Sequence, residues 1–482
     1  MKGIFELNAV TGELKVSGIK ESDEESGTDY VSMADCQGLN GELISNPGHR
    51  FYAYDPDNDD WNLLLTFNSG LGIGPSCRLS EGSFVIAANA EAALITGVEL
   101  APYDKENGRS VVKVAYLGTG NYIEYAGIDL PQYEYQGTKY AGAEYDPEFQ
   151  QDVDRFLVSM MAGKEVPDLV IFLGDCLNTS SDAFDDLLPY IDRDMSRDEF
   201  LPHFIDAFSA GGELHTISSQ VTIQCVFARE EDVGDGIGLA PADYTEILRK
   251  SEKYKALFEA YLSANQFLSS GISDMAASIF TDSENAEAHF DDPAFGELLT
   301  WCREMGKEVR EGSNFEDYSL SEILLKSENI GNLIRLDVIR RYFGDSIVPV
   351  GLPDGSEGFN YYIPAEASFA IPSGSQNKEG AWAYIKEILS QDNQLMIGSS
   401  AYLPVNYAAL IRKAEASLSE AGQRLLSELL DRTKYASTYS DQGLRDIIVS
   451  SAQGYMSGSR TLEDTVAVIQ SRASVYMGQN YG

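Results

Sequence analysis

Polar side chains follow the ends of two apolar stretches in the first half of the chain. VVKVAYLG is followed by residues 119–122 (TGNY), and DLVIFL is followed by residues 174–178, which include Asp175 and Asn178. Both stretches have the length and composition of buried strands, and ligands of α/β proteins bind at the carboxyl ends of strands. The amide, carboxylate and phenol groups of these loops suit a neutral polyhydroxyl ligand. We therefore predict that Asp175 and Asn178 contribute to a binding site.

Two adjacent tyrosines could supply aromatic contacts to the same kind of ligand. Tyr361 and Tyr362 follow FN near the start of an extended apolar segment. A tyrosine ring has an apolar face that can stack on a sugar ring. Ordinary core packing is the alternative for each of them, because the chain contains 27 tyrosines.

Catalytic and metal-binding patterns are missing from the sequence. The four histidines have no ligand spacing, no GxSxG elbow is present, and the five cysteines form no CxxC pair. The glycine-rich GLGIGPS lacks the spacing of a phosphate loop, and DPDNDD lacks the glycine and glutamate of a calcium loop. We expect no metal, no cofactor and no catalytic residue, and we expect the cysteines to be free buried thiols.

Charge and length restrict the partners. The chain has 482 residues and a formal net charge of -41, so its field repels nucleic acid and anionic membrane surfaces. No stretch reaches the roughly 18 apolar residues that a membrane span needs. The N-terminal residues MKGIFELNAV lack the apolar region of a signal peptide. Either the protein is cytoplasmic or this sequence lacks its natural start.

Residues 1–108 have the pattern of short strands joined by tight turns. Hairpins are expected within residues 2–18, across the turn DPDNDD, and around residues 80–82. Repeated hairpins at this spacing are typical of propeller blades, but a segment of this length holds roughly two blades of about 40–45 residues. We predict a partial, propeller-like β segment.

Residues 109–482 follow a β–α–β pattern and then become helical. We predict a two-lobed α/β domain, with lobe 1 at about 109–220 plus later returning segments, and lobe 2 at about 225–340 plus C-terminal helices. Residues 244–262 (YTEILRKSEKYKALFEAYL) read as helical. A further helix should begin after Asn377, which can cap it, and should bury Trp382 in its apolar stripe.

Five segments, in order, carry a resemblance to a known family. PDLVIFLGDCLN with DDLLPYIDRDM and GELHTISSQ, NAEAHFDDPAFGELLTWCREM, residues 363–394, LPVN at 403–406, and TLEDTVAVIQSRASVYM form this series. Together they resemble the extracellular solute-binding proteins of ABC importers, in the sugar-binding branch and with an ending like that of Firmicutes members. The resemblance covers about residues 110–482.

The resemblance implies a type II periplasmic-binding-protein fold whose hinged lobes close on a ligand, which is then delivered to a membrane permease. Carbohydrate, and in particular oligosaccharide, is the favoured ligand. The segments that cross between the lobes place Ser219, Gln220 and Asn360 beside the two tyrosines as predicted ligand contacts. The family also implies a monomer outside the cell, anchored as a lipoprotein in its full-length form. A binder of peptide or another polar solute, a carbohydrate-active enzyme and a surface adhesin remain alternatives.

Overall fold

The computed structural model describes the strands between Ile4 and Thr96 by their backbone, and most of the chain beyond Ser110 with its side chains. The described residues from there on are 110–118, 128, 130, 132–140, 147–173, 183–258, 264–283, 285–306, 319–344, 346–396, 401–437 and 442–481. The chain divides into two compact units. Unit 1 comprises Met1–Val112 and Tyr122–Gln136, and unit 2 comprises Lys113–Asn121 and Gly137–Gly482.

Unit 1 contains antiparallel hairpins, as the sequence predicted. The strands β1 and β2 pair with each other, β3 to β6 form one sheet in sequence order, and β7 to β9 form another. β5 and β6 pair antiparallel with Asp55 opposite Asp60, so a hairpin forms where the sequence predicted one. The propeller relationship stays a prediction. The strands are β1 (Ile4–Leu7), β2 (Leu14–Ser17), β3 (Cys36–Gln37), β4 (Leu43–Ser45), β5 (Arg50–Asp55), β6 (Asp60–Thr66), β7 (Ile73–Ser80), β8 (Ser83–Ala88) and β9 (Glu91–Thr96).

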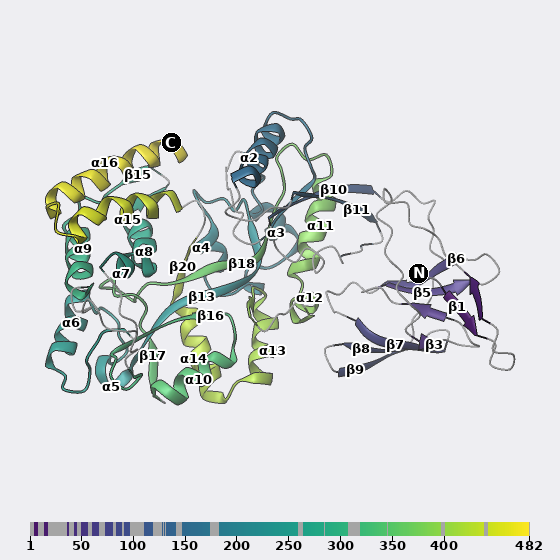
Figure 1. Cartoon of the computed structure of the whole chain (residues 1–482), viewed down its shortest axis with the longest axis horizontal. Coiled ribbons are helices and arrows are strands. Elements are labelled where there is room, and N and C mark those ends of the chain that lie inside the picture. The colour runs from purple at the N-terminus through teal and green to yellow at the C-terminus, as the bar shows by residue number, and fades with distance from the viewer. Residues whose placement is uncertain are drawn as a thin grey trace. The chain divides into compact units, whose positions relative to one another are not determined.

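A mixed sheet runs through unit 2 (Figure 1). Its order is β11-β10-β12-β18-β13-β16, with β17 and β19 also paired to β13 and β20 to β18. β10 and β12 are parallel, which matches the β–α–β pattern, whereas β12, β18 and β13 pair antiparallel. The strands are β10 (Ser110–Gly118), β11 (Tyr133–Tyr140), β12 (Leu169–Leu173), β13 (Ile217–Arg229), β14 (Thr281–Asp282), β15 (Glu287–Ala288), β16 (Leu325–Ile330), β17 (Ile347–Pro349), β18 (Asn360–Ala370), β19 (Leu403–Pro404) and β20 (Thr433–Ala436).

Helices cover this sheet in two groups. In Figure 1, α2, α3 and α11 gather toward one end of the long strands, and α8, α9, α15 and α16 toward the other. The helices are α2 (Pro147–Met161), α3 (Leu188–Asp194), η3 (Arg197–Glu199), α4 (Phe204–Phe208), α5 (Glu230–Val233), α6 (Pro241–Lys250), α7 (Ala264–Phe267), the π-helical η4 (Leu268–Ile272), α8 (Ser273–Ile279), α9 (Pro293–Gly306), α10 (Ile334–Phe343), α11 (Lys378–Leu389), α12 (Gln391–Met396), α13 (Tyr407–Ser417), α14 (Glu420–Asp431), α15 (Gln442–Met456) and α16 (Leu462–Asn480).

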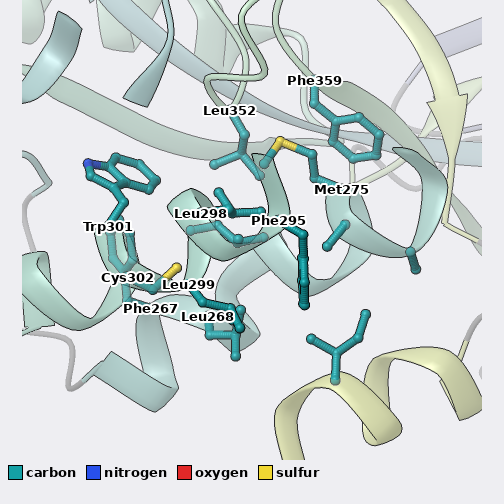
Figure 2. Packing of buried hydrophobic residues seen from close by; sticks show 14 of the residues in the cluster. Phe267, Leu268, Met275, Phe295, Leu298, Leu299, Trp301, Cys302, Leu352 and Phe359 are labelled. Carbon is teal, nitrogen blue, oxygen red and sulfur yellow. The ribbon is translucent and has the colours of Figure 1, made fainter. Parts of the chain in front are cut away.

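Two of the hydrophobic clusters formed by the described residues of unit 2 mark its two lobes. The core of lobe 1 joins β10 and β12 to α2, and includes Phe156, Phe172 and Phe184. The core of lobe 2 is larger and joins α7 to α9 with α15 and α16; Figure 2 shows Phe267, Phe295 and Trp301 within it. Each core can hold its own lobe together, because burial of apolar side chains is the main stabilising contribution to folding.

The two longest strands connect the lobes. Ala370 at the end of β18 belongs to the core of lobe 1, whereas Tyr361 near its start belongs to the core of lobe 2. β13 runs antiparallel beside it, and Val226 and Ala228 near its end also pack into lobe 2. A pair of strands shared by two cores is the kind of element about which two lobes can rotate.

Local predictions were confirmed in lobe 1 and corrected in lobe 2. Asn377 caps α11 by accepting a hydrogen bond from the Gly380 backbone N–H, and Trp382 is buried, as predicted. The helix predicted across residues 244–262 instead ends at Lys250, and residues 259–262 lie outside the described residues. Beyond Ser251 the chain runs through a series of bends, and the Tyr254 ring packs beneath the Arg229 guanidinium, so a long-range contact overrides the local helical pattern.

Candidate functional site

The structure describes five of the seven predicted ligand contacts. Asp175 and Asn178 lie outside the described residues. Ser219 and Gln220 lie on β13, and the other three residues lie at the start of β18. All five are buried, with exposed fractions of 0% (Ser219), 2% (Gln220), 0% (Asn360), 5% (Tyr361) and 0% (Tyr362).

The pairing of β13 with β18 holds these residues at two places. Gln220 pairs with Ala365, whereas Tyr361 pairs with Gln224 four residues farther along β13. At about 3.3 Å per residue, this separates Gln220 from the tyrosine pair by roughly 10–13 Å along the strands. The predicted residues therefore do not form one cluster.

The two tyrosines point to opposite faces of β18, as consecutive residues of a strand must. The Tyr362 hydroxyl donates to the Pro202 carbonyl over 2.7 Å, and its ring packs against Phe204 and Phe208 of α4. The Tyr361 ring packs against Phe359 in the core of lobe 2. Neither ring presents a free face, so the predicted stacking on a sugar is not supported for either residue.

Ser219 and Asn360 are buried polar side chains without hydrogen-bond partners. The Ser219 hydroxyl and both polar atoms of the Asn360 amide are sealed from solvent and unpaired among the described residues. Such groups cost free energy unless something satisfies them. Because both side chains are fully enclosed in this conformation, a ligand could reach them only after the surrounding segments move.

A polar cluster that the sequence analysis missed lies beside the crossing strands. Arg445 donates to the Ser437 hydroxyl over 2.8 Å, Ser437 donates to Asp274 Oδ1 over 3.1 Å, and Arg445 also contacts Asp274 Oδ1 directly. The second guanidinium nitrogen of Arg445 donates to Gln442 Oε1 over 2.8 Å. We call Asp274, Ser437, Gln442 and Arg445 the lobe-2 polar cluster.

Three elements position this cluster. Asp274 lies in the first turn of α8, directly after the π-helical turn η4. Ser437 follows β20, and its backbone N–H donates to the Tyr362 carbonyl over 2.8 Å, which fixes it against β18. Arg445 lies in the first turns of α15, on the same helix as the exposed Gln442. The cluster therefore runs from the crossing strand outward to solvent.

The chemistry of the lobe-2 polar cluster suits hydroxyl groups. A carboxylate and an amide oxygen accept hydrogen bonds, a guanidinium donates them, and a serine hydroxyl does both. The Asp274 and Arg445 charges compensate each other, with side-chain exposures of 11% and 19%, so the cluster has no strong preference for a charged ligand. Such an arrangement can bind a neutral polyhydroxyl compound.

No metal centre accompanies the cluster. Within the described ranges, no group of three or more His, Cys, Asp or Glu side chains could hold a metal ion. His215, on the segment that enters β13, contacts the Phe184 carbonyl and Glu213 instead. The buried Cys225 and Cys302 are free thiols, as predicted, and burial raises the pKa of both.

No helix of the described chain combines the length and apolar character that membrane crossing requires. No protein-family model matches the chain, and no curated protein matches it either. Comparison with solved structures does give matches.

The sugar-binding protein MalE from Xanthomonas citri is 13% identical, and the match covers 77% of this chain and 98% of that protein with a TM-score of 0.53. The chain has the two-lobed fold of periplasmic binding proteins. This confirms the predicted fold class and, at the level of fold, the resemblance to sugar-type solute-binding proteins. A de novo designed esterase is also 13% identical, with coverage of 78% and 100% and a TM-score of 0.51. The cyclic alpha-maltosyl-1,6-maltose binding protein from Arthrobacter globiformis is 12% identical, with coverage of 77% and 100% and a TM-score of 0.49.

Proposed function

We propose that this protein is the extracellular binding component of an ABC importer and captures a carbohydrate between the two lobes of unit 2. The observation that carries the proposal is the pair β13 and β18, which joins two independent cores and has a polar, charge-compensated cluster beside it. The MalE-like fold supports it, because that match covers nearly the whole of a sugar-binding protein.

In the proposed mechanism, hydroxyl groups of the carbohydrate contact the lobe-2 polar cluster while the lobes are apart. Rotation about β13 and β18 then brings lobe 1 onto the other side of the ligand and excludes water. Hydrogen bonds between the ligand and the cluster gain strength when water is excluded, because the local dielectric falls. The loop containing Asp175 and Asn178 stays a predicted contribution from lobe 1.

The closed form would deliver its ligand to a membrane permease, and the protein would act as a monomer tethered outside the cell by a lipid anchor. We propose binding without catalysis. The designed esterase of similar fold shows that this architecture can also accommodate catalysis, so turnover must be measured directly.

Thermal unfolding in the presence of maltotriose, mannobiose, xylobiose or cellobiose tests the proposal, with trialanine as the peptide alternative. A compound that binds the native state alone raises the melting temperature by linkage. A shift with one sugar, without sugar consumption, is expected. A shift with trialanine alone would replace carbohydrate by peptide, and hydrolysis of a sugar would replace binding by catalysis.

A further inference from the structure

Tyr361 has an unused hydroxyl group beside the lobe-2 polar cluster. The residue is only 5% exposed, and its hydroxyl makes no hydrogen bond with any described residue. The hydroxyl of its fully buried neighbour Tyr362 donates a hydrogen bond to the Pro202 carbonyl. Unlike the Ser219 hydroxyl and the Asn360 amide, the Tyr361 hydroxyl is not among the fully enclosed unpaired atoms of the described residues, so water or a ligand group can pair with it.

The surroundings of this hydroxyl place it near Asp274. A Cβ atom built on Gly271 would lie 3.1 Å from Tyr361 Oη, so the hydroxyl lies against the π-helical turn η4. Gly271 has a φ of +96°, which lets the backbone approach the ring this closely. Asp274 follows three residues later. Burial raises the pKa of the Tyr361 phenol, Asp274 raises it further, and Arg445 lowers it, as expected for a phenol close to both charges.

The Asp274 carboxylate can also accept a further hydrogen bond. It accepts from Ser437 and Arg445 at Oδ1, and no described residue donates to Oδ2. The Tyr361 hydroxyl lies against η4, Asp274 follows η4 in the first turn of α8, and no hydrogen bond joins the two side chains. A hydroxyl group inserted between them could accept from the phenol and donate to the carboxylate, which satisfies both.

We propose that the Tyr361 hydroxyl is a ligand-binding and specificity-determining group, which donates a hydrogen bond to a sugar hydroxyl held at the lobe-2 polar cluster. This inference rests on the proposed function and replaces the stacking role predicted for Tyr361 by a hydrogen-bonding role. It also specifies the ligand: one of its hydroxyl groups must be free to act as both donor and acceptor. A site built to pair with a hydroxyl discriminates strongly against a compound that lacks it.

The test compares Tyr361→Phe with the matched control Tyr362→Phe. Calorimetric titration with maltotriose, mannobiose, xylobiose and cellobiose measures the affinity, and thermal unfolding without sugar measures the stability. For Tyr361→Phe we expect affinity for the bound sugar to fall about tenfold or more, with an unchanged melting temperature, because the hydroxyl has no hydrogen bond to a described residue to lose. For Tyr362→Phe we expect a lower melting temperature and unchanged affinity, because a paired hydroxyl outside the site is lost.

The outcomes separate this inference from the proposed function. If the wild-type protein binds a sugar and Tyr361→Phe binds it within twofold of the wild type, the hydroxyl makes no ligand contact and the inference is overturned, whereas the proposed function stands. If both variants lose affinity and melting temperature in parallel, Tyr361 acts through the fold and the inference is likewise overturned. If the wild-type protein binds none of the four sugars, the proposed function and the inference fall together.

Discussion

The Ser375 hydroxyl donates to Asp168 Oδ1 over 2.9 Å, although the two residues are separated by more than half of unit 2 along the chain. The same oxygen accepts the backbone N–H groups of Gln376 (3.0 Å) and Asn377 (2.8 Å), and Oδ2 accepts that of Lys113 (2.9 Å). The Asp168 carboxylate therefore joins β10, the start of β12 and the turn before α11. These hydrogen bonds attach the returning segment, residues 375–377, to the first strands of lobe 1.

Substitution of Asp168 tests the contribution of these hydrogen bonds to stability. Four donor groups surround the Asp168 carboxylate. Asp168→Asn replaces one of its two acceptor oxygens by an NH2 donor, so we expect the free energy of unfolding to fall by about 1–3 kcal/mol. Urea denaturation measures it. The control is Asp192→Asn, which removes an exposed ion pair with Arg197 and should change the free energy of unfolding much less, because solvent screens the pair. Equal losses in the two variants would contradict the role given to Asp168.

The sequence contained enough information for the scaffold of lobe 1. The helix after Asn377, the burial of Trp382 and the parallel strands around α2 all follow from local periodicity and capping residues. The end of α6 at Lys250 did not, because Tyr254 is held by Arg229 from a distant strand. Tertiary contacts of this kind leave no trace in a short window of sequence.

The candidate site was harder to predict for the same reason. Asp274 and Arg445 come together across 171 residues, and neither belongs to a recognisable motif. The predicted contacts on β13 and β18 are correctly placed on the crossing strands, but their side chains are buried there. Position along a strand could be predicted, whereas the direction and environment of each side chain depend on the whole fold.

Two glycines before β18 differ in the space around them and give a second prediction. Gly358 has a φ of +84°, and an added Cβ would lie 1.6 Å from the Val350 carbonyl oxygen. Gly355 has a φ of +79° with open space around it. Gly355→Ala should cost about 1–2 kcal/mol of backbone strain. Gly358→Ala should cost more than about 3 kcal/mol, because the backbone must also move. Similar urea midpoints for the two variants would show that the Gly358 backbone does not lie this close to the Val350 carbonyl.

Asp337 gives a prediction for the pH dependence of stability. Burial alone would raise the pKa of this carboxyl, but hydrogen bonds from Ser419 and Arg340 outweigh burial and lower it. A group with a lowered folded-state pKa stabilises the fold above its unfolded-state pKa, and this contribution is lost as the pH falls through the folded-state value. The difference in unfolding free energy between the wild type and Asp337→Asn should therefore shrink as the pH falls below about 4.

Glu428 on α14 provides a control of opposite sign. Burial raises its pKa, although Arg432 partly opposes this. The contribution of a group with a raised pKa is present at low pH and is lost as the pH rises through the folded-state value. The difference between the wild type and Glu428→Gln should therefore shrink as the pH rises. Urea denaturation between pH 3 and pH 7 measures both differences. If they change with pH in the same direction, the opposite pKa shifts given to Asp337 and Glu428 are wrong.

Arg445 tests the lobe-2 polar cluster itself. Arg445→Gln should lower the affinity for the bound sugar about tenfold or more, because it removes a charged donor. Arg472→Gln on α16 removes a guanidinium that contacts Ser450 and Ser451, and should leave affinity unchanged. Calorimetric titration distinguishes the two variants.

The single variant leaves Asp274 as a partly buried, unpaired carboxylate, so Arg445→Gln should also be destabilised. Asp274→Asn combined with Arg445→Gln removes both charges and should recover much of that stability without recovering affinity. If affinity returns together with stability, the cluster supports the fold and does not bind the ligand.

Capture of a carbohydrate between the lobes is the central claim, and the most direct measurement is the melting temperature of the wild-type protein with maltotriose, mannobiose, xylobiose, cellobiose and trialanine. The account predicts that one of the sugars raises the melting temperature in a concentration-dependent manner and that Arg445→Gln suppresses the shift. An unchanged melting temperature with every sugar, together with a shift produced by trialanine, would contradict it.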